Sequence, residues 1–455
     1  MAIKKLIQKM IYFKNIKILT LLVLIISINA QAQLPSKVLV GYWENWGNLR
    51  LKDVDNRYNV LCLSFLEADK GWPATPLNNI VNDLEFTPTN KTTLKKDIPL
   101  LQEQGKKILI SIGGGNGSFR LNNSSDKNVF IQKVKDFINE YNVDGIDIDL
   151  EQGTYVCAPG SNISNPTDMH VKNLISAIKE IMQWYKSKFN RKLILTMAPE
   201  TTYVQGGLSN WSVKNICGGA YLALIEQLRD EIDLLMVQLY NSGSILDLNG
   251  KETFEKSIDF PISATETVIK GFTAKGGLGK YSGLPEEKIV VGLTTCKNDE
   301  AYFNKSEIKS IMRYLLGSGN KPGSYTLKNK YPNLRGLMTW SINTDAKMSS
   351  QSSCNPVVKY EFAQAFEEIF GLINNGLGEI KIKKLNIFPN PASDRVIIDT
   401  KELIGKFITI SDFNGRIIKN LLVNDSNTII NINKLSNGFY IVKSTSFVGK
   451  IIVKK

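Results

Sequence analysis

Histidine is almost absent from this chain of 455 residues, which contains only His170. Serine hydrolases of the Ser-His-Asp type need a histidine base, and histidine-rich zinc sites need several such residues. His170 follows Asp168 at the start of an amphipathic stretch that runs to about Phe189, so we expect a surface helical residue. The chemistry must therefore rest on carboxylates, tyrosine, lysine or cysteine, and we expect no metal and no cofactor.

An excess of positive charge is missing from most of the chain, although the net charge is +13. The segment before Gln33 has five lysines and no acid, and from Glu379 onward 13 Lys and Arg residues face 6 Asp and Glu residues. The 38 basic and 37 acidic residues in between nearly cancel. The main domain therefore lacks the basic surface expected of a nucleic-acid-binding protein.

Long hydrophobic runs are also missing. The run from Ile18 to Ile28 has eleven residues, whereas a helix that spans a bilayer needs about 20. Lysines precede this run and Ala30-Gln31-Ala32 follows it, which is the pattern of a secretory signal peptide over residues 1–32. We therefore expect a secreted protein, extracellular or at the cell surface, without a stable membrane span.

After this leader, short apolar runs alternate with helical patterns, as in βαβ units. The predicted strands are residues 37–42, 59–65, 107–113, 143–151, 192–198, 233–240, 288–293 and 335–341. The predicted helices are residues 126–141, 168–189, 306–316 and 357–370. Eight such strands predict an α/β fold, a (β/α)8 TIM barrel over residues 33–370. A doubly wound sheet is the alternative, but we find no G-x-G-x-x-G turn that opens a helix.

The composition changes after Phe370. Residues 371–384 resemble a linker, and residues 385–455 contain short β-rich runs separated by the turn signals Asn390-Pro391, Asn414-Gly415 and Asn437-Gly438. This pattern predicts a small all-β sandwich. The predicted strands there are residues 396–399, 407–411, 428–432, 439–444 and 450–453.

Only five cysteines are present, and an exported protein can keep them as disulfides. Cys157 and Cys217 lie in the loops after the fourth and fifth strands, and Cys296 and Cys354 follow the seventh and eighth. Because neighbouring loops share one face of a barrel, we expect the pairs Cys157–Cys217 and Cys296–Cys354, with Cys62 a buried thiol. The alternative is that all five are unpaired, since sequence does not determine connectivity.

The run Asp144-Gly145-Ile146-Asp147-Ile148-Asp149-Leu150-Glu151 contains an alternation of acidic and aliphatic residues. Its three alternating acids are Asp147, Asp149 and Glu151. A period of two predicts a strand with its acids on one face. A solvated charged face is the alternative. On the fourth strand of a barrel, however, these acids would lie in the barrel mouth, where closely spaced carboxyls cannot all ionise. Glu151, the outermost, is the candidate general acid.

The same run resembles the D-G-x-D-x-D-x-E signature of glycoside hydrolase family 18, the chitinases and their relatives. Other segments resemble further family motifs, in the family's order: Ser111-Ile112-Gly113-Gly114, Thr196-Met197-Ala198-Pro199-Glu200, Met236-Val237-Gln238-Leu239-Tyr240-Asn241 and Met338-Thr339-Trp340-Ser341. The resemblance covers residues 37–345. Several motifs in register are far more specific than any one alone.

The resemblance implies a mechanism in which the substrate's own 2-acetamido oxygen attacks the anomeric carbon. Glu151 would protonate the leaving oxygen and later activate water. Asp149 would hydrogen-bond the acetamide N–H, and Asp147 would share a proton with Asp149. Tyr240 would bind the acetamide carbonyl, and Trp340 would form the floor beneath the reacting sugar.

Further substrate-binding residues are assigned from the same motifs and strand ends: Gln238, Asn241, Tyr42, Phe65, Gly113, Gly114, Ser111, Ala198 and Glu200. Phe65 could equally be barrel core, and sugar stacking by Trp43, Trp46, Trp72 and Trp211 stays open. The glycine-rich run is assigned to packing under the sugar and not to phosphate binding, because no Gly-Lys-Ser/Thr follows it.

One departure concerns the sixth strand, where many bacterial members of the family have Tyr-Asp and this chain has Tyr240-Asn241 preceded by Gln238. This resembles plant-type and related bacterial chitinases with a compact barrel. Residues 294–335 hold loops and a helix in place of the α+β domain that walls the groove in deep-cleft relatives. We therefore expect an open cleft.

The tail has a resemblance of its own. The runs Ile387 to Asp394, Asn414 to Ile418 and Leu435 to Val442, with the terminal Lys454-Lys455, resemble the C-terminal sorting domain of type IX secretion. The type IX secretion machinery would then be a partner. A carbohydrate-binding sandwich is the alternative, but the tail contains no tryptophan for a sugar platform.

Together these features predict a secreted, endo-acting, monomeric chitinase that hydrolyses β-1,4-linked N-acetylglucosamine polymers by substrate-assisted retaining catalysis. An endo-β-N-acetylglucosaminidase acting on the chitobiose core of N-glycans is the alternative. A non-catalytic chitin-binding lectin is disfavoured because Glu151 is intact.

Overall fold

The computed structural model describes residues 34–68, 80–151, 160–209, 212–213, 216–347, 354, 358–371, 383–404, 407–412, 417–444 and 447–455. The predicted signal peptide and most of the predicted linker lie outside these residues. The chain divides into two compact units, Met1–Asn375 and Gly376–Lys455, and each is described by itself.

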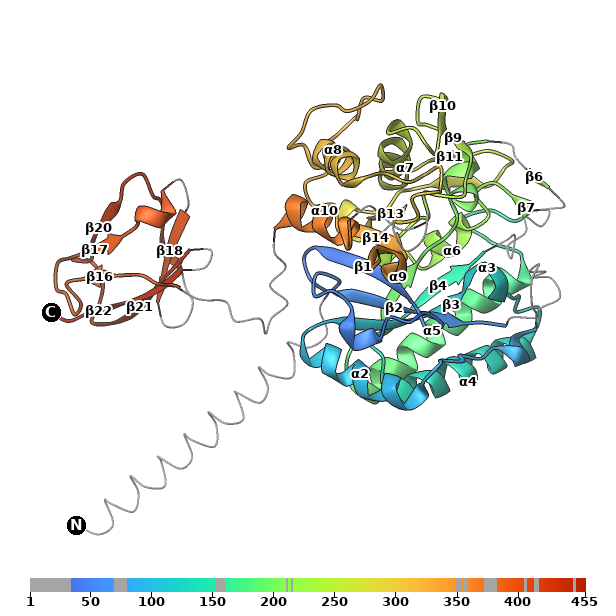
Figure 1. Ribbon diagram of the computed structural model, residues 1–455, viewed down its shortest axis with the longest axis horizontal. Coiled ribbons are helices and arrows are strands. Elements are labelled where there is room, and N and C mark those ends of the chain that lie inside the picture. Colours follow the sequence, from blue (N-terminus) through green and yellow to red (C-terminus); the bar gives the residue numbers. More distant parts are fainter. Residues whose placement is uncertain are drawn as a thin grey trace, which may run out of the picture. The chain divides into compact units, whose positions relative to one another are not determined.

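The first unit is built on a sheet of eight parallel strands, of which Figure 1 labels β1, β2, β3, β4, β13 and β14. The strand order is β13-β14-β1-β2-β3-β4-β5-β8. The strands are β1 (Val38–Glu44), β2 (Val60–Leu66), β3 (Lys107–Gly113), β4 (Gly145–Leu150), β5 (Ile194–Met197), β8 (Leu234–Leu235), β13 (Val290–Thr294) and β14 (Gly336–Trp340). Isolated bridges, Leu235 with Ile289 and Gln238 with Gly292, join the two edge strands. The predicted TIM barrel is therefore confirmed.

The sixth barrel strand, β8, is much shorter than the predicted run of residues 233–240. Regular pairing stops at Leu235, and beyond it Gln238 makes only single bridges to Glu200 and Gly292. Asn241 then has a left-handed φ of 53°, which ends the extended conformation. The segment that carries Gln238 and Tyr240 is therefore held by single bridges between its neighbours and not by a regular ladder.

Helices surround the barrel: α2 (Lys91–Glu103), α4 (Ser124–Tyr141), α5 (Met169–Phe189), α6 (Leu222–Gln227), α7 (Asp259–Lys270), α8 (Lys305–Leu316) and α10 (Glu361–Phe370), with the short α3 (Gly114–Gly117) and α9 (Ile342–Asp345). The period-two alternation of the strands separates two apolar layers. On β4, Ile146 and Ile148 belong to the layer under the helices. On β1 and β2, Val38, Val40 and Cys62 belong to the barrel interior.

His170 is buried and not on the surface as expected, with only 9% of its area exposed. It lies four residues before Leu174 and eight before Ile178, so it falls on the buried face of α5. Burial and the nearby Arg120 lower the pKa of His170 to about 4, so the imidazole is neutral at physiological pH.

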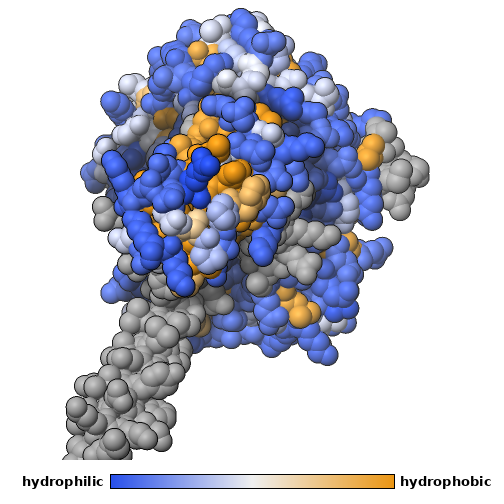
Figure 2. All heavy atoms as spheres, turned by 90° about the vertical axis from the view of Figure 1, so that its left-hand side faces the viewer, coloured by the Kyte–Doolittle hydropathy of each residue, from blue (hydrophilic) through white to orange (hydrophobic). Residues whose placement is uncertain are grey.

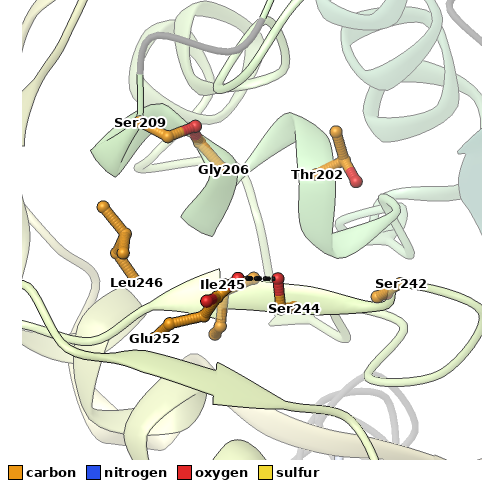
Figure 3. Close-up of a pocket in the computed structure, with 8 residues that line it drawn as sticks. All are labelled: Thr202, Gly206, Ser209, Ser242, Ser244, Ile245, Leu246 and Glu252. Atoms are coloured by element: carbon orange, nitrogen blue, oxygen red, sulfur yellow. Dashed lines mark hydrogen bonds between the residues drawn. The ribbon is translucent and has the colours of Figure 1, made fainter.

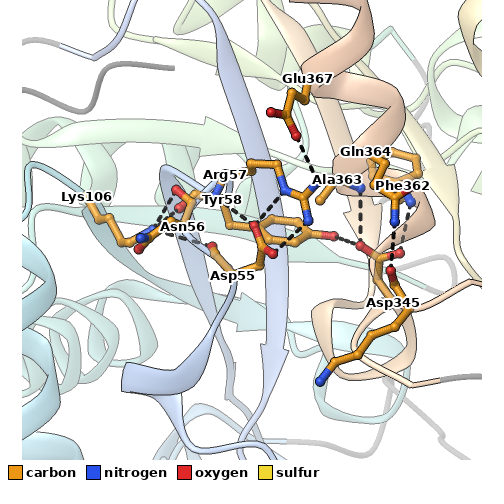
Figure 4. A network of polar contacts seen from close by, with 11 residues as sticks. Asp55, Asn56, Arg57, Tyr58, Lys106, Asp345, Phe362, Ala363, Gln364 and Glu367 are labelled. Atoms are coloured by element: carbon orange, nitrogen blue, oxygen red, sulfur yellow. Dashed lines mark hydrogen bonds and ion pairs between the residues drawn. The ribbon is translucent and has the colours of Figure 1, made fainter. Parts of the chain in front are cut away.

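A polar network joins the loop before β2 to α10 (Figure 4). The buried Lys106 ammonium donates to the carbonyls of Asn56 and Tyr58 at 3.0 and 2.6 Å. The Tyr58 hydroxyl donates to Asp345 at 2.7 Å, and Asp345 accepts the backbone N–H of Phe362 at 2.9 Å in the first turn of α10. This network ties the last helix of the barrel to its second strand.

The loops at the carboxyl ends of β5 and β8 carry extra elements that the sequence patterns did not predict. After β5 come two 3₁₀ helices, η3 (Thr201–Tyr203) and η4 (Gln205–Leu208), and the strand pair β6 (Ser212–Val213) and β7 (Ile216–Cys217). After β8 comes the hairpin of β9 (Ser244–Leu246) with β10 (Glu252–Phe254), and a second hairpin, β11 (Phe272–Ala274) with β12 (Gly279–Tyr281), follows α7.

The predicted disulfide Cys296–Cys354 is present. It joins the loop after β13 to the segment after β14. Cys62 is a buried free thiol, as expected. Cys157 and the side chain of Cys217 lie outside the described part of the chain, so that pair stays a prediction.

The second unit contains two sheets that share one apolar core. One has the order β15-β22-β21-β18-β19 and the other β16-β17-β20. Their strands are β15 (Lys383–Lys384), β16 (Ile387–Phe388), β17 (Arg395–Asp399), β18 (Phe407–Asp412), β19 (Ile417–Leu422), β20 (Asn427–Asn431), β21 (Gly438–Ser444) and β22 (Phe447–Val453). Val396 and Ile430 from one sheet pack with Ile410, Val442 and Ile451 from the other. The predicted small β-sandwich is confirmed.

Large hydrophobic side chains are also exposed on the surface. Figure 2 shows such orange patches set among hydrophilic residues on one face of the molecule. Among the described residues, twelve large hydrophobic side chains are exposed, and half of them belong to the second unit: Phe388, Ile404, Ile418, Leu422, Ile429 and Phe439. Relative to its length, the smaller unit therefore exposes more large hydrophobic side chains.

In the described part of the chain, none of the helices combines the length and apolar character that a membrane span requires.

Candidate active site

Strand β4 carries the two acids Asp147 and Asp149 into the barrel interior, where 0% and 3% of their areas are exposed. Their aliphatic neighbours Ile146 and Ile148 point to the helix layer. Glu151 follows the end of β4 and is partly exposed. The three acids therefore form a column that runs from the barrel interior to its mouth, on the face that the sequence pattern indicates.

Three hydroxyl donors surround Asp147. The Tyr42 hydroxyl on β1 donates at 2.7 Å, Ser111 on β3 at 2.8 Å and Thr196 on β5 at 2.5 Å. Burial raises the pKa of Asp147, and these three hydrogen bonds oppose that rise because they stabilise the carboxylate. Thr196 belongs to a quoted motif but was not among the predicted site residues.

Asp149 and Glu151 share a hydrogen bond. Burial raises the pKa of Asp149 well above its usual range, and the charges of Glu151 and Asp147 raise it further. Burial also raises the pKa of Glu151, but hydrogen bonds from Gln238 and Asp149 oppose that rise. The two carboxyls are therefore coupled through one hydrogen bond, and the pKa values of both lie above their usual range. The oxygens of Asp147 accept from hydroxyl donors, and the expected sharing of a proton between Asp147 and Asp149 stays a prediction.

The Gln238 side chain bridges the two outer acids. Its Nε2 donates to Asp149 Oδ1 at 2.9 Å, to Glu151 Oε1 at 3.0 Å and to the Ala198 carbonyl at 3.0 Å. One amide nitrogen has two hydrogens for these three acceptors. Gln238 therefore contacts the acids themselves. Its expected role in substrate binding stays a prediction.

The Tyr240 side chain lies beside these acids, with 7% of its area exposed. Burial raises the pKa of its hydroxyl well above the usual range, and the charges of Asp149 and Glu151 add to the rise. The hydroxyl therefore stays protonated. Within the described residues it makes no protein hydrogen bond, so it can donate to a ligand.

Four aromatic rings gather at the barrel mouth. Trp340 stacks on Phe65 with ring centroids 5.5 Å apart and planes 13° apart. Tyr42 lies 5.9 Å from Trp340, and Trp46 lies 6.3 Å from Trp340 and 6.2 Å from Phe65. Trp46, whose role the sequence left open, is 53% exposed. This aromatic cluster (Tyr42, Trp46, Phe65 and Trp340) can hold the apolar face of a sugar ring.

Glycine is required where β3 ends. Gly113 and Gly114 have φ values of 113° and 78°. A Cβ on Gly113 would lie 2.3 Å from the Asp149 carbonyl oxygen, and one on Gly114 would lie 2.8 Å from the Phe65 ring. These two residues therefore let the chain pass between the acids and the aromatic cluster without contributing side chains.

Ser118 is a further residue at the site that the sequence did not indicate. Its buried hydroxyl accepts the backbone N–H of Glu151 at 2.7 Å and donates to the Gly114 carbonyl at 3.2 Å. It lies seven residues after Ser111 in the same polar, glycine-rich run, but only the return of the loop toward β4 reveals the contact.

The remaining predicted residues lie at the edge of the site. Ala198 contributes its carbonyl to Gln238, and the charge of Glu200 adds to the raised pKa of Asp149. Asn241 is exposed. Asp299, which the sequence did not indicate, adds its charge near Tyr240. Trp72 and Trp211 lie outside the described residues.

Comparison with known proteins agrees with this geometry. The family described as glycosyl hydrolases family 18 matches residues 38–448. Chitinase Chi52 of Paenibacillus xylanexedens is 36% identical over 330 residues, which cover 70% of this chain and 60% of that protein. A probable class II chitinase of Arthroderma benhamiae is 33% identical over 325 residues, which cover 68% of this chain and 94% of that protein.

A solved structure, that of a family GH18 chitinase from Chromobacterium violaceum, has a TM-score of 0.60 at 28% identity and covers 74% of this chain and 84% of that chain. The chain spans about 60% of the length of Chi52 and of Chitinase D from Niallia circulans. The family match, these relatives and the barrel with its column of acids show that the chain belongs to glycoside hydrolase family 18.

Proposed function

We propose that this protein is a secreted chitinase that hydrolyses β-1,4-linked N-acetylglucosamine polymers. The observation that carries the proposal is the hydrogen-bonded pair Asp149 and Glu151, bridged by Gln238 and adjacent to the Tyr240 hydroxyl. The relatives named above, which are called chitinases, support the choice of substrate.

In the proposed mechanism Glu151 protonates the leaving oxygen and later activates water, because it is the outermost acid and its pKa is raised by burial. The substrate's 2-acetamido oxygen attacks the anomeric carbon. Asp149 hydrogen-bonds the acetamide N–H, and Tyr240 donates to the acetamide carbonyl, which holds it in line. Asp147, fixed by its hydroxyl donors, contributes charge behind Asp149.

The aromatic cluster supports the reacting sugar from below, with Trp340 stacked on Phe65 as the floor. Gly113 and Gly114 keep the space next to this floor open. Between β13 and β14 the described chain holds α8 and loops. This supports an open cleft, internal cuts in the polymer and poor processivity.

A product analysis on colloidal chitin beside a high-mannose glycoprotein tests the substrate. We expect chitobiose and longer soluble products from chitin. Cleavage of the glycoprotein alone would identify an endo-β-N-acetylglucosaminidase, and binding to chitin without turnover would identify a lectin.

The stereochemistry of the products tests the mechanism. Two inversions, one by acetamide and one by water, leave the anomeric configuration retained. We therefore expect fresh products of chitin oligomers with the retained anomer in NMR spectra taken before mutarotation. Glucan oligomers lack the acetamide and should not be cut at a comparable rate. Inverted products, or efficient glucan cleavage, would contradict the mechanism.

We propose further that residues 1–32 are a signal peptide and that residues 385–455, after a linker at 371–384, form a sorting domain read by the type IX secretion machinery. The quoted sequence resemblances support this, and so does a second unit with its own core. The catalytic domain then spans residues 33–370 and acts as a monomer, without a nucleic-acid partner.

A further inference from the structure

A cavity of about 480 Å³ lies next to the acid column but is not part of it. Its walls are η3 and η4 after β5 on one side and the β9–β10 hairpin after β8 on the other (Figure 3). The lining residues are Thr202, Gly206, Ser209, Ser242, Ser244, Ile245, Leu246 and Glu252. Its volume falls within the range of sites that hold small molecules or single sugars.

Two hydrogen bonds connect this cavity to the segment that carries the site. The Ser242 hydroxyl donates to the Tyr240 carbonyl at 2.9 Å. The Thr201 hydroxyl, next to Thr202 in the chain, donates to the Gln238 carbonyl. Both walls follow carboxyl ends of barrel strands, which is the end of the barrel at which Glu151 lies.

The cavity offers hydrogen-bond acceptors and few donors. Of its four hydroxyl side chains, Ser209 donates to the Gly206 carbonyl at 2.9 Å, Ser242 to the Tyr240 carbonyl, and Ser244 to Glu252 Oε1 at 2.6 Å. Since a hydroxyl has one hydrogen and two lone pairs, Ser242 and Ser244 face a ligand as acceptors.

Glu252 supplies the only charge among the eight lining residues. In the described part of the chain it makes no ion pair with a lysine or arginine, and its second carboxylate oxygen can accept a ligand donor. Its neighbour Lys251 points its ammonium toward the Ser324 hydroxyl at 3.4 Å. Glu252 is exposed, so solvent screens part of its charge. The cavity therefore favours a ligand that brings several hydrogen-bond donors together with a positive charge.

Further acids lie behind the cavity wall. Glu255 accepts the backbone N–H of Ser242 at 2.6 Å. Burial raises the pKa of Asp299, and the charges of Glu255 and Glu300 raise it further. Lys256 lies 3.9 Å from Glu300, but both side chains are 70% exposed, so solvent screens this pair. The acids Glu252, Glu255, Asp299 and Glu300 therefore outnumber the bases Lys251 and Lys256 around the cavity.

We propose that this cavity is a sugar subsite that selects a glucosamine unit, so that partly deacetylated chitin is the preferred polymer. The ammonium of glucosamine brings three donors and a positive charge to Glu252 and the serine oxygens. The N-acetyl group of the usual unit brings one donor and a carbonyl that needs a donor in return. The proposal rests on the proposed function, since it names a substrate of the same cleft.

The test compares wild type, Glu252→Gln and the control Glu103→Gln, which changes an exposed acid at the end of α2. Each enzyme cuts hexamers of N-acetylglucosamine with one glucosamine at each position in turn, and mass spectrometry locates the cut. Wild type and control should favour glucosamine at one fixed distance from the cut bond. Glu252→Gln should lose this preference in kcat/KM by about fivefold to tenfold. The wild-type preference should also weaken at high salt.

An equal preference in all three enzymes, or no preference in wild type, would overturn the subsite. A wild type that cuts none of the hexamers would instead contradict the proposed function. In that case calorimetry with fully deacetylated hexamer decides the inference: weaker binding by Glu252→Gln than by Glu103→Gln supports the subsite, and equal binding refutes it.

Discussion

At the scale of single residues, three chemically similar carboxyls differ because their neighbours differ. Asp147 accepts hydrogen bonds from three hydroxyls, which favour its charged form. Asp149 lies between two other acids in a buried position, so its pKa rises most. Glu151 reaches the barrel mouth, where a substrate can meet it. The division of work among the acids follows from these surroundings.

The first prediction concerns Glu151→Gln. Gln has nearly the same shape but cannot donate a proton to the leaving oxygen, so kcat should fall by about a thousandfold or more. Binding of chitin oligomers, measured by calorimetry, should stay within about threefold of wild type. Hydrolysis near the wild-type rate would refute the role of Glu151 as the acid.

The second prediction concerns Gln238→Met, which keeps the length of the side chain but removes its amide hydrogens. The hydrogen bond from Gln238 opposes the raised pKa of Glu151, so its loss should raise that pKa further. Glu151 would then keep its proton to higher pH, and the basic limb of the pH profile of kcat/KM should move to higher pH. We expect kcat to fall roughly tenfold to a hundredfold as well. An unchanged basic limb would contradict this tuning role.

At the scale of elements, the end of β3 decides how closely the acids and the aromatic cluster approach each other. Gly114 has a φ of 78°, and the Phe65 ring occupies the space where its Cβ would lie. Gly160 has the same φ of 78° but nothing within 4 Å of such a Cβ. An alanine at either position would have the same backbone strain, but only an alanine at Gly114 would also meet the Phe65 ring. A comparison of the two substitutions therefore distinguishes the cost of strain from the cost of steric contact.

The third prediction follows from the equal φ values of Gly114 and Gly160 and their different surroundings. Gly114→Ala should lower the free energy of unfolding by roughly 1–3 kcal/mol more than Gly160→Ala does, because only the former displaces a packed ring. It should also raise KM for chitin oligomers, because Phe65 supports Trp340. The measurements are urea unfolding and steady-state kinetics. Equal losses of unfolding free energy in both variants would show that the Phe65 ring moves aside at no energetic cost, and this would contradict the prediction.

The fourth prediction concerns the start of α10. Burial raises the pKa of Asp345 to about 6 from 3.8, so the folded state binds its proton more tightly than the unfolded state. The stability from this group is fully present below about pH 3.8 and is lost as pH rises through about 6. Asn at this position does not titrate. Between about pH 4 and 7, the free energy of unfolding of wild type should therefore fall by up to about 3 kcal/mol relative to Asp345→Asn.

Urea unfolding followed by tryptophan fluorescence measures this difference. All six tryptophans precede residue 376, so the signal reports the first unit alone. Other titrating groups are common to both proteins and cancel in the comparison. Parallel curves across this pH range would show that Asp345 is not protonated in the folded protein.

At the scale of the whole molecule, the chain consists of two units with separate apolar cores. The Cys296–Cys354 disulfide and the network of Asp345 and Tyr58 lie entirely within the first. Each unit therefore has the means to fold by itself.

The fifth prediction is that deletion of residues 381–455 leaves both chitin hydrolysis and the tryptophan-detected unfolding curve of the barrel unchanged. Release from the native host cell should stop, because the proposed sorting signal is lost. The full-length protein expressed in parallel is the control for export. Normal export of the shortened chain would count against a sorting role, and lost activity would show that the barrel depends on the sandwich.

Much of the fold could be predicted because strands and helices depend on patterns among residues that are close in the sequence. The period of two in residues 144–151 depends only on the geometry of an extended chain, so it correctly indicates that Asp147 and Asp149 share one face. The eight strand runs likewise predict the barrel, and the quoted motifs predict which strand ends form the site. The buried position of His170 was also available in the spacing to Leu174, although the prediction placed it on the surface.

Only the tertiary structure determines which side chains of the site hydrogen-bond to one another. Gln238 meets Asp149 and Glu151 across 89 and 87 residues of sequence, and only closure of the barrel brings them together. The hydroxyls of Ser111 and Thr196 reach Asp147 from the neighbouring strands β3 and β5, and that of Tyr42 reaches it from β1, which does not pair with β4. The cavity at Glu252 arises between loops that follow different strands. Sequence determines what each strand presents to its two faces, but distances between strands follow from how the whole sheet closes.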